Sequence, residues 1–163
     1  MKRNELEIIK QAIINEIESY EFYRMAIKDF ENPQVRAVLT EFMNEEKDHV
    51  MWLEALFAKM KESHKDDVVL SSIPSPQPDK PFQFDVSKLK NLSSLMSVYS
   101  IGMELEGKAT QFYLEQEKLA EDEDARRLYK ILASWEKTHY NMFYKMYESL
   151  KDEWWSQQNY APF

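Results

Sequence analysis

The chain has 163 residues, two of them glycine and none cysteine, and it carries a formal net charge of −8 at pH 7. This length suits one domain with a buried core, which we expect to span residues 1–163. The acidic balance argues against nucleic acid or an anionic membrane surface as a partner. The lack of cysteine excludes disulfides, thiolate metal sites and iron–sulfur centres on this chain.

The sequence gives no sign of a targeting or membrane segment. The residues after Met1 mix apolar with charged side chains, and no run approaches the roughly 18 apolar residues of a membrane span. We therefore expect no signal peptide, no membrane span and a cytoplasmic location. The scarcity of glycine and the abundance of Glu, Lys, Leu and Met favour an all-α protein.

Four segments show the three- and four-residue spacing of a helix with one buried face. The first covers about residues 4–30 and the second about residues 33–65. Between them, Asn32 can cap the second helix and Pro33 can occupy its first turn. The third covers about residues 92–121 and the fourth about residues 123–155. The acidic residues 121–124 are expected to form the last turn and begin the fourth helix, because negative charge suits a helix N-terminus.

The helical period is lost over about residues 66–91, which we interpret as a crossover on the outside of the bundle. Its prolines are Pro74, Pro76, Pro78 and Pro81. Its apolar residues, expected to pack along the bundle, are Val68, Val69, Leu70, Phe82 and Phe84. About 25 extended residues, at about 3.3 Å each, can travel the length of a long helix, so the third helix should run parallel to the second. The tail after Trp155, with Tyr160 and Phe163, is expected to dock on the bundle or on a second subunit.

One pattern occurs twice, and its two copies are offset by 90 positions at every member. In each half a glutamate is followed seven residues later by a tyrosine, and Glu-x-x-His begins 23 residues after that. The first copy is Glu16, Tyr23, Glu46 and His49, and the second is Glu106, Tyr113, Glu136 and His139. Four carboxylates and two imidazoles from four helices are the ligand inventory of a dinuclear metal site.

The four repeated glutamates fall on the apolar faces of their predicted helices. A buried carboxylate without a partner costs free energy, and four clustered carboxylates would also repel one another. Two divalent cations would balance the four negative charges, with both imidazoles neutral. We therefore expect metal binding to stabilise the fold.

The spacing also predicts a role for each ligand. The two residues of Glu-x-x-His lie one turn apart on the same helix face, so both can reach one site. Glu46 and Glu136 are expected to bridge the metals, and Glu16 and Glu106 to be terminal ligands. The two histidines, His49 and His139, would each complete one metal. Oxygen-rich ligation with one imidazole per metal suits iron or manganese, and zinc can occupy such ligands in a purified sample.

The two tyrosines of the pattern admit two interpretations. Tyr23 and Tyr113 lie two turns from a ligand on the same face, where each phenol can donate to a carboxylate of the opposite helix or simply pack in the core. His64, near a helix end and close to Lys61, is interpreted as an exposed histidine. The whole pattern has its own alternatives: a bundle in which glutamate is merely abundant, or a duplicated descendant that has lost its metals.

The repeated phrases resemble the rubrerythrin branch of the ferritin-like di-iron carboxylate superfamily. The resemblance covers about residues 4–155 and implies an up-down-down-up four-helix bundle, a di-iron site at mid-bundle and often a homodimer. It also implies a reaction of reduced iron with hydrogen peroxide or dioxygen. The phrases are Glu16-Ile-Glu-Ser-Tyr-Glu-Phe-Tyr23, Glu45-Glu46-Lys-Asp-His49, Glu106-Gly-Lys-Ala-Thr-Gln-Phe-Tyr113 and Trp135-Glu136-Lys-Thr-His139.

The sequence departs from the rubrerythrin pattern in two ways. Rubrerythrins that reduce peroxide carry another Glu three residues after the third-helix ligand, and that position here is Ala109, with Ser19 as its first-half counterpart. Small residues there can leave room for an oxygen ligand. The cysteine-bound rubredoxin domain that supplies electrons in full-length rubrerythrins is also missing, so electrons would come from an external donor protein or a small reductant.

These observations favour a rubrerythrin-type oxidoreductase with two iron ions, or iron and manganese, that reduces hydrogen peroxide or dioxygen by two electrons. One alternative is a ferroxidase or iron-binding protein that oxidises and sequesters iron. Another is a di-iron oxygenase acting on an organic substrate, for which Tyr20 and Thr110 could line a pocket.

The ligand assignment predicts that His139→Ala lowers metal content and, with metal present, the melting temperature. The matched variant His64→Ala should change neither, because His64 is not part of the repeated pattern. Metal analysis and thermal unfolding of the two variants test this. Equal metal content in both would contradict the assignment.

Overall fold

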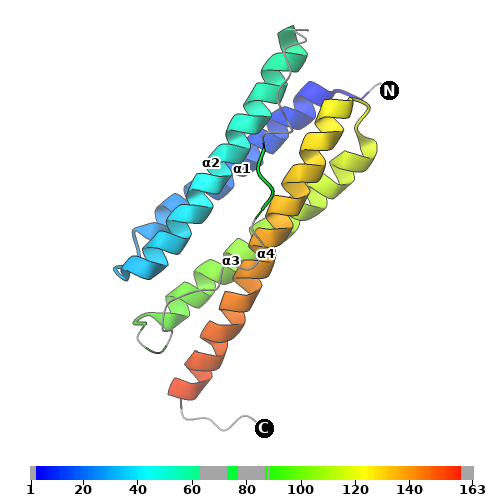
Figure 1. The fold of residues 1–163 in the computed structure, drawn as a ribbon. Helices are drawn as coiled ribbons and strands as arrows, with labels where there is room; N and C mark the ends of the chain where they lie inside the picture. Colours follow the sequence, from blue (N-terminus) through cyan, green and yellow to red (C-terminus); the bar gives the residue numbers. More distant parts are fainter. Residues whose placement is uncertain (1–2, 63–72, 77–86, 88, 159–163) are drawn as a thin grey trace.

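The protein is all-α in the part of the chain that the structure describes, and up-down-down-up in topology. The computed structural model describes residues 3–62, 73–76, 87 and 89–158. The four helices are α1 (Glu5–Ile27), α2 (Pro33–Glu62), α3 (Leu92–Leu119) and α4 (Glu123–Gln157). Antiparallel pairs α1·α2 and α3·α4 pack together, and α3 runs in the same direction as α2 (Figure 1). The predicted fold class is confirmed.

The helix bounds match the sequence prediction closely, with one informative difference. α1 was expected to continue to about residue 30 but ends at Ile27. The next three backbone N–H groups, of Lys28, Asp29 and Phe30, each donate to the carbonyl three residues earlier rather than four. The chain therefore tightens into a turn before the predicted end, as helix C-termini often do.

In each helical hairpin, a side chain in the turn caps the N-terminus of the second helix. Asn32 Oδ1 accepts from the backbone N–H groups of Gln34 and Val35 at 2.9 and 3.1 Å. At the start of α4, Asp122 Oδ1 accepts from the N–H of Ala125 at 2.9 Å. Each cap satisfies N–H groups that the first helical turn leaves without a carbonyl partner.

Two arginines, also 90 positions apart, hold the end of the preceding helix. Arg36 donates to the carbonyls of Ile27 and Phe30, at 3.1 Å each, and Arg126 donates to the carbonyl of Ala120 at 2.6 Å. The repeat seen in the sequence is therefore also a repeat of local structure.

The apolar core forms two clusters, one towards each end of the bundle. The first centres on Phe42, Tyr99 and Phe143, and the second on Leu53 and Leu128. Along every helix the repeated glutamate lies between residues of the two clusters. The bundle therefore encloses a polar layer at its middle, with apolar packing on both sides.

The described part of the crossover lies against α4. Ile73 packs on the second apolar cluster, and Trp135 Nε1 donates to the carbonyl of Pro74 at 3.0 Å. Several residues with sequence-based expectations lie outside the described residues: His64, Val68, Val69, Leu70, Pro78, Pro81, Phe82, Phe84, Tyr160 and Phe163. Among the helices described, none is both long and apolar enough to cross a membrane.

The packing of Phe143 predicts a large difference between two neighbouring aromatic residues. Phe143 is fully buried and stacks on Phe42 with ring centroids 4.3 Å apart, whereas Tyr144 is 49% exposed. Phe143→Ala should lower the free energy of unfolding by about 3–5 kcal/mol, because it leaves a cavity. Tyr144→Ala should change it by less than about 0.5 kcal/mol. Urea unfolding measures both, and equal losses would contradict the assigned packing.

Candidate metal centre

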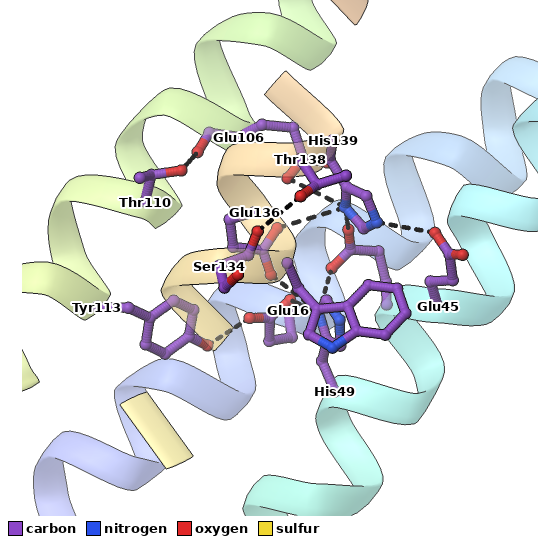
Figure 2. Close-up of polar contacts among 12 residues, drawn as sticks. Glu16, Glu45, His49, Glu106, Thr110, Tyr113, Ser134, Glu136, Thr138 and His139 are labelled. Carbon is purple, nitrogen blue, oxygen red and sulfur yellow. Dashed lines mark hydrogen bonds and ion pairs between the residues drawn. The ribbon is translucent and has the colours of Figure 1, made fainter. Parts of the chain in front are cut away.

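The six side chains predicted as ligands converge in the polar layer (Figure 2). One glutamate comes from each of α1 and α3, and a Glu-x-x-His pair comes from each of α2 and α4. All are at most 2% exposed: Glu16, Glu46, His49, Glu106, Glu136 and His139. The three- and four-residue spacing places these groups on the same helix faces as the core residues, which is why they are buried.

His49 presents its Nδ1 atom to three carboxylates. The nearest is Glu136 Oε1 at 2.8 Å, from the other half of the chain. Glu46 Oε2 lies at 3.4 Å and Glu16 Oε2 at 3.5 Å. These four residues form one candidate ligand group, whose donor atoms all lie within 4.8 Å of one another.

His139 has the equivalent surroundings on the other side of the layer. Its Nδ1 lies 3.2 Å from Glu46 Oε1, and 3.5 Å from Glu106 Oε2 and from Glu136 Oε2. These residues form a second candidate group. Donor atoms that bind one ion at about 2.1 Å in octahedral geometry lie roughly 3 Å from their neighbours, so separations of this size fit a shared cation.

Glu46 and Glu136 belong to both groups. Each directs one carboxylate oxygen towards His49 and the other towards His139. A carboxylate in this orientation can bind two cations at once, one through each oxygen. Glu16 and Glu106 belong to one group each, and the arrangement is therefore two bridging and two terminal carboxylates.

The repeated tyrosines connect the two halves. Tyr23 of α1 donates to Glu106 Oε1 of α3, and Tyr113 of α3 donates to Glu16 Oε1 of α1. Of the two interpretations that the sequence left open for these tyrosines, the contacts are donation to a carboxylate of the opposite helix rather than core packing alone. The other oxygen of each glutamate faces a histidine. Burial, and then the charge of the bonded glutamate, raise the pKa of each phenol, which therefore stays protonated and donates.

Several buried ligand atoms make no hydrogen bond within the described residues. They are Glu46 Oε1 and Oε2, His49 Nδ1 and Nε2, Glu136 Oε1 and His139 Nδ1. Buried polar atoms are normally hydrogen-bonded, and leaving them without partners costs free energy. Apart from His49 Nε2, these atoms face the shared interior of the two ligand groups. Cations there would satisfy them, so the residues fit a metal pair.

Without cations the layer holds protons. Burial, and then repulsion from Glu46, raise the pKa of Glu16 to about 7. Burial, and then repulsion from Glu136, raise the pKa of Glu106 to about 8. Burial acts to lower the pKa of His49, but the charge of Glu136 and the contacts with Glu16 and Glu46 together outweigh it, and the net pKa lies well above the usual value. The layer therefore attracts positive charge, as protons or as metal ions.

The pKa values of His139 and Glu136 follow from the same charges. Burial lowers and Glu106 raises the pKa of His139, with a net shift well upward. Burial and the charge of Glu16 act to raise the pKa of Glu136, but the charge of His49 and the polar contacts with Glu106 and His139 together outweigh them, so the net shift is downward. Glu136 therefore stays ionised more readily than Glu16 or Glu106.

One contact was not predicted from the sequence. His139 Nε2 lies 2.8 Å from Glu45 Oε2, a hydrogen-bond distance, on the side of the ring away from the ligand group. Glu45 immediately precedes the bridging Glu46 and is 25% exposed. Its second-half counterpart is Trp135, so the repeat gave no signal for it.

The two residues proposed from the sequence as pocket lining are separated. Thr110 donates its hydroxyl to the carbonyl of Glu106 at 2.7 Å and lines a shallow groove of about 540 Å³ between α3 and α4. Tyr20 is partly buried in α1 and does not line that groove, and neither does any of the six ligands. This groove therefore does not give the metal centre an organic-substrate pocket.

Comparison with known proteins places this geometry in a family. The family model described as rubrerythrin matches residues 7–147. The chain belongs to the rubrerythrin family. A solved structure of a hypothetical protein from Pyrococcus furiosus is 26% identical, with 90% of each chain covered and a TM-score of 0.68. A search of curated proteins found no match.

Family membership and the buried Glu/His clusters together indicate a di-iron carboxylate protein with a metal-binding site. The position of the additional carboxylate of peroxide-reducing rubrerythrins is occupied by Ala109, which packs against the second apolar cluster. Its counterpart Ser19 is buried. Neither position supplies a fifth carboxylate to the layer.

The raised pKa values predict opposite effects of pH on stability and on metal binding. In the folded protein Glu16 and Glu106 have pKa values of about 7 and 8, above their ordinary value of 4.5. The folded state therefore binds more protons than the unfolded state, and the associated stability, complete below about pH 4.5, is lost as pH rises through 7 to 8. Metal must displace these protons, so its affinity should rise over the same range.

Thermal unfolding between pH 6 and 8.5 tests this prediction. The melting temperature of metal-free protein should fall as pH rises, and the increase caused by added Mn²⁺ should grow. Glu16→Gln should flatten the pH dependence of the metal-free protein, because it removes one of the raised groups. A melting temperature independent of pH would contradict the assignment.

Proposed function

We propose that this protein is a non-haem di-iron oxidoreductase that reduces hydrogen peroxide or dioxygen by two electrons. The observation that carries the proposal is the pair of four-residue ligand groups sharing Glu46 and Glu136. A shared pair of carboxylates would hold two cations close together, so that two one-electron donors could act on one O–O bond. Family membership supports the same reaction class.

The donor set favours iron over other metals. Each group offers three carboxylates and one imidazole, with no thiolate available anywhere in the chain. Carboxylate-rich sites with a single imidazole suit iron and manganese, whereas zinc sites more often take several nitrogen or sulfur ligands. Two iron ions, or one iron and one manganese, are therefore the proposed cofactors.

The bound ferrous pair would supply one electron per ion, so that hydrogen peroxide and two protons give two molecules of water. The protein's own part is to hold the ions and to control their surroundings. The apolar clusters on both sides exclude bulk water from the layer. Tyr23 and Tyr113 fix one oxygen of each terminal glutamate and leave the other oxygen facing a histidine.

The absence of a carboxylate at Ala109 shapes the proposed mechanism. A mechanism in which an iron moves to an additional glutamate has no ligand to use at this position. The six side chains of the two ligand groups would therefore hold the ions, with no further carboxylate at this position. The small side chains of Ala109 and Ser19 would leave room for the oxygen substrate.

Electrons must be returned to the site after each reaction. The chain has no cysteine with which to hold its own rubredoxin-type iron, so an external donor protein or a small reductant is proposed. All six ligands are at most 2% exposed. The donor would therefore transfer electrons through the bundle rather than by direct contact with the ions.

The proposal predicts that anaerobically reconstituted protein binds two ferrous ions per chain and oxidises both after mixing with peroxide or with oxygen. Rapid-mixing absorbance and metal analysis measure this. Glu136→Gln should bind fewer than two ions and lose the rapid oxidation, because one bridging charge is gone. The exposed control Glu104→Gln should behave like the unmodified protein.

Two outcomes would contradict the proposed oxidoreductase function or favour another function. Inertness of the ferrous protein towards both oxidants would contradict an oxidoreductase. Uptake of many irons per chain, with assembly into a shell on size-exclusion chromatography, would favour the ferroxidase and iron-sequestering function instead.

A further inference from the structure

The two halves of the metal centre are alike around the Nδ1 atoms of their histidines but differ around the Nε2 atoms. On the Nδ1 side, each histidine faces its own terminal glutamate and both bridging glutamates. On the Nε2 side, the repeat is broken one residue before each bridging glutamate, where Glu45 corresponds to Trp135.

His139 has a carboxylate partner for its second nitrogen. Its Nε2 lies 2.8 Å from Glu45 Oε2, across the contact between α4 and α2 (Figure 2). A neutral imidazole that binds a metal through Nδ1 carries its proton on Nε2. Glu45 accepts that proton's hydrogen bond, so it fixes the tautomer and the ring orientation that a metal at Nδ1 needs.

His49 has aromatic surroundings instead. Its Nε2 makes no hydrogen bond within the described residues, and the ring lies 5.2 Å from that of Trp52 and 5.6 Å from that of Trp135, between centroids. An indole ring has no nitrogen or oxygen acceptor, and the single N–H of Trp135 is donated to the carbonyl of Pro74. An Nε2–H on buried His49 therefore loses water without gaining an acceptor, which costs free energy.

We propose that the two metal positions are unequal, that the position ligated by His139 and Glu106 binds its ion more tightly and fills first, and that Glu45 is the positioning residue that makes the difference. This inference rests on the proposed metal pair. The bridging carboxylates are shared and cannot by themselves distinguish the positions. The hydrogen bond to Glu45 is made at only one of them.

The size of the difference follows from the effect of such contacts elsewhere. Loss of a hydrogen-bond partner of a metal-binding histidine typically costs about 10–100-fold in metal affinity. The first and second dissociation constants of the unmodified protein should therefore differ by roughly that factor. With one ion per chain, most molecules would then have only the tighter position occupied. A different metal added afterwards would occupy the weaker position and give a mixed pair.

Anaerobic titration of metal-free protein with Mn²⁺ tests the inference without any catalytic measurement. Calorimetry gives the two dissociation constants, and low-temperature electron paramagnetic resonance distinguishes isolated Mn²⁺ from a coupled pair. At one equivalent, isolated Mn²⁺ should dominate in the unmodified protein. Glu45→Ala should weaken the tight step by about 10–100-fold and leave the weak step nearly unchanged, so that the two steps merge.

Two further variants separate the hydrogen bond from the charge. Glu45→Gln keeps an acceptor and removes the charge, so it should lose less affinity than Glu45→Ala. Asp48→Ala removes an exposed carboxylate one residue before His49 and should leave both steps unchanged. Equal losses in Asp48→Ala and Glu45→Ala would show a general charge effect and overturn the inference, as would a Glu45→Ala variant that binds like the unmodified protein.

The number of ions bound and the order in which they bind test different proposals. Binding of fewer than two ions by the unmodified protein would overturn the proposed function itself. Binding of two ions in indistinguishable steps, with the pair already coupled at one equivalent, would overturn only the inequality. Circular dichroism of each variant, compared before titration, shows whether the fold is retained, and Glu45→Gln is the variant that disturbs the side-chain volume least.

Discussion

Four carboxylates buried side by side are the constraint on which the rest of this structure depends. Each loses its hydration, and all repel one another, so the layer at mid-bundle is stable only with positive charge between them. The apolar clusters above and below keep water out and so strengthen this requirement. The raised pKa values of Glu16 and Glu106 have the same cause, because burial and repulsion between the carboxylates favour a bound proton.

The duplicated halves are incomplete without each other. Each ligand group takes three residues from one half and its fourth, a bridging glutamate, from the other. The phenol that holds each terminal glutamate also comes from the opposite half. The site residues therefore join the two hairpins at mid-bundle, between the two apolar clusters that also span both hairpins, and binding of ions would strengthen this connection.

The sequence predicted most of this arrangement because the repeat places the same residue types on the same helix faces. Helix periodicity was enough to position Glu16, Tyr23 and Glu106, whose contacts lie along the inward stripes. It did not predict the role of Glu45, which lies about 100° around the helix from Glu46 and meets His139 through packing of α2 on α4. A repeat identifies what two halves share, whereas a contact present in one half needs the tertiary structure. The early end of α1 was missed for a local reason instead, because an apolar period does not encode the turn hydrogen bonds of Lys28, Asp29 and Phe30.

Anomalous diffraction at the iron edge, from crystals grown anaerobically with ferrous iron, examines the central claim most directly. The account predicts two peaks, both between the carboxylates of Glu46 and Glu136, with one beside His49 Nδ1 and the other beside His139 Nδ1. A map without peaks in this layer, or with iron only on the acidic surface, would contradict it.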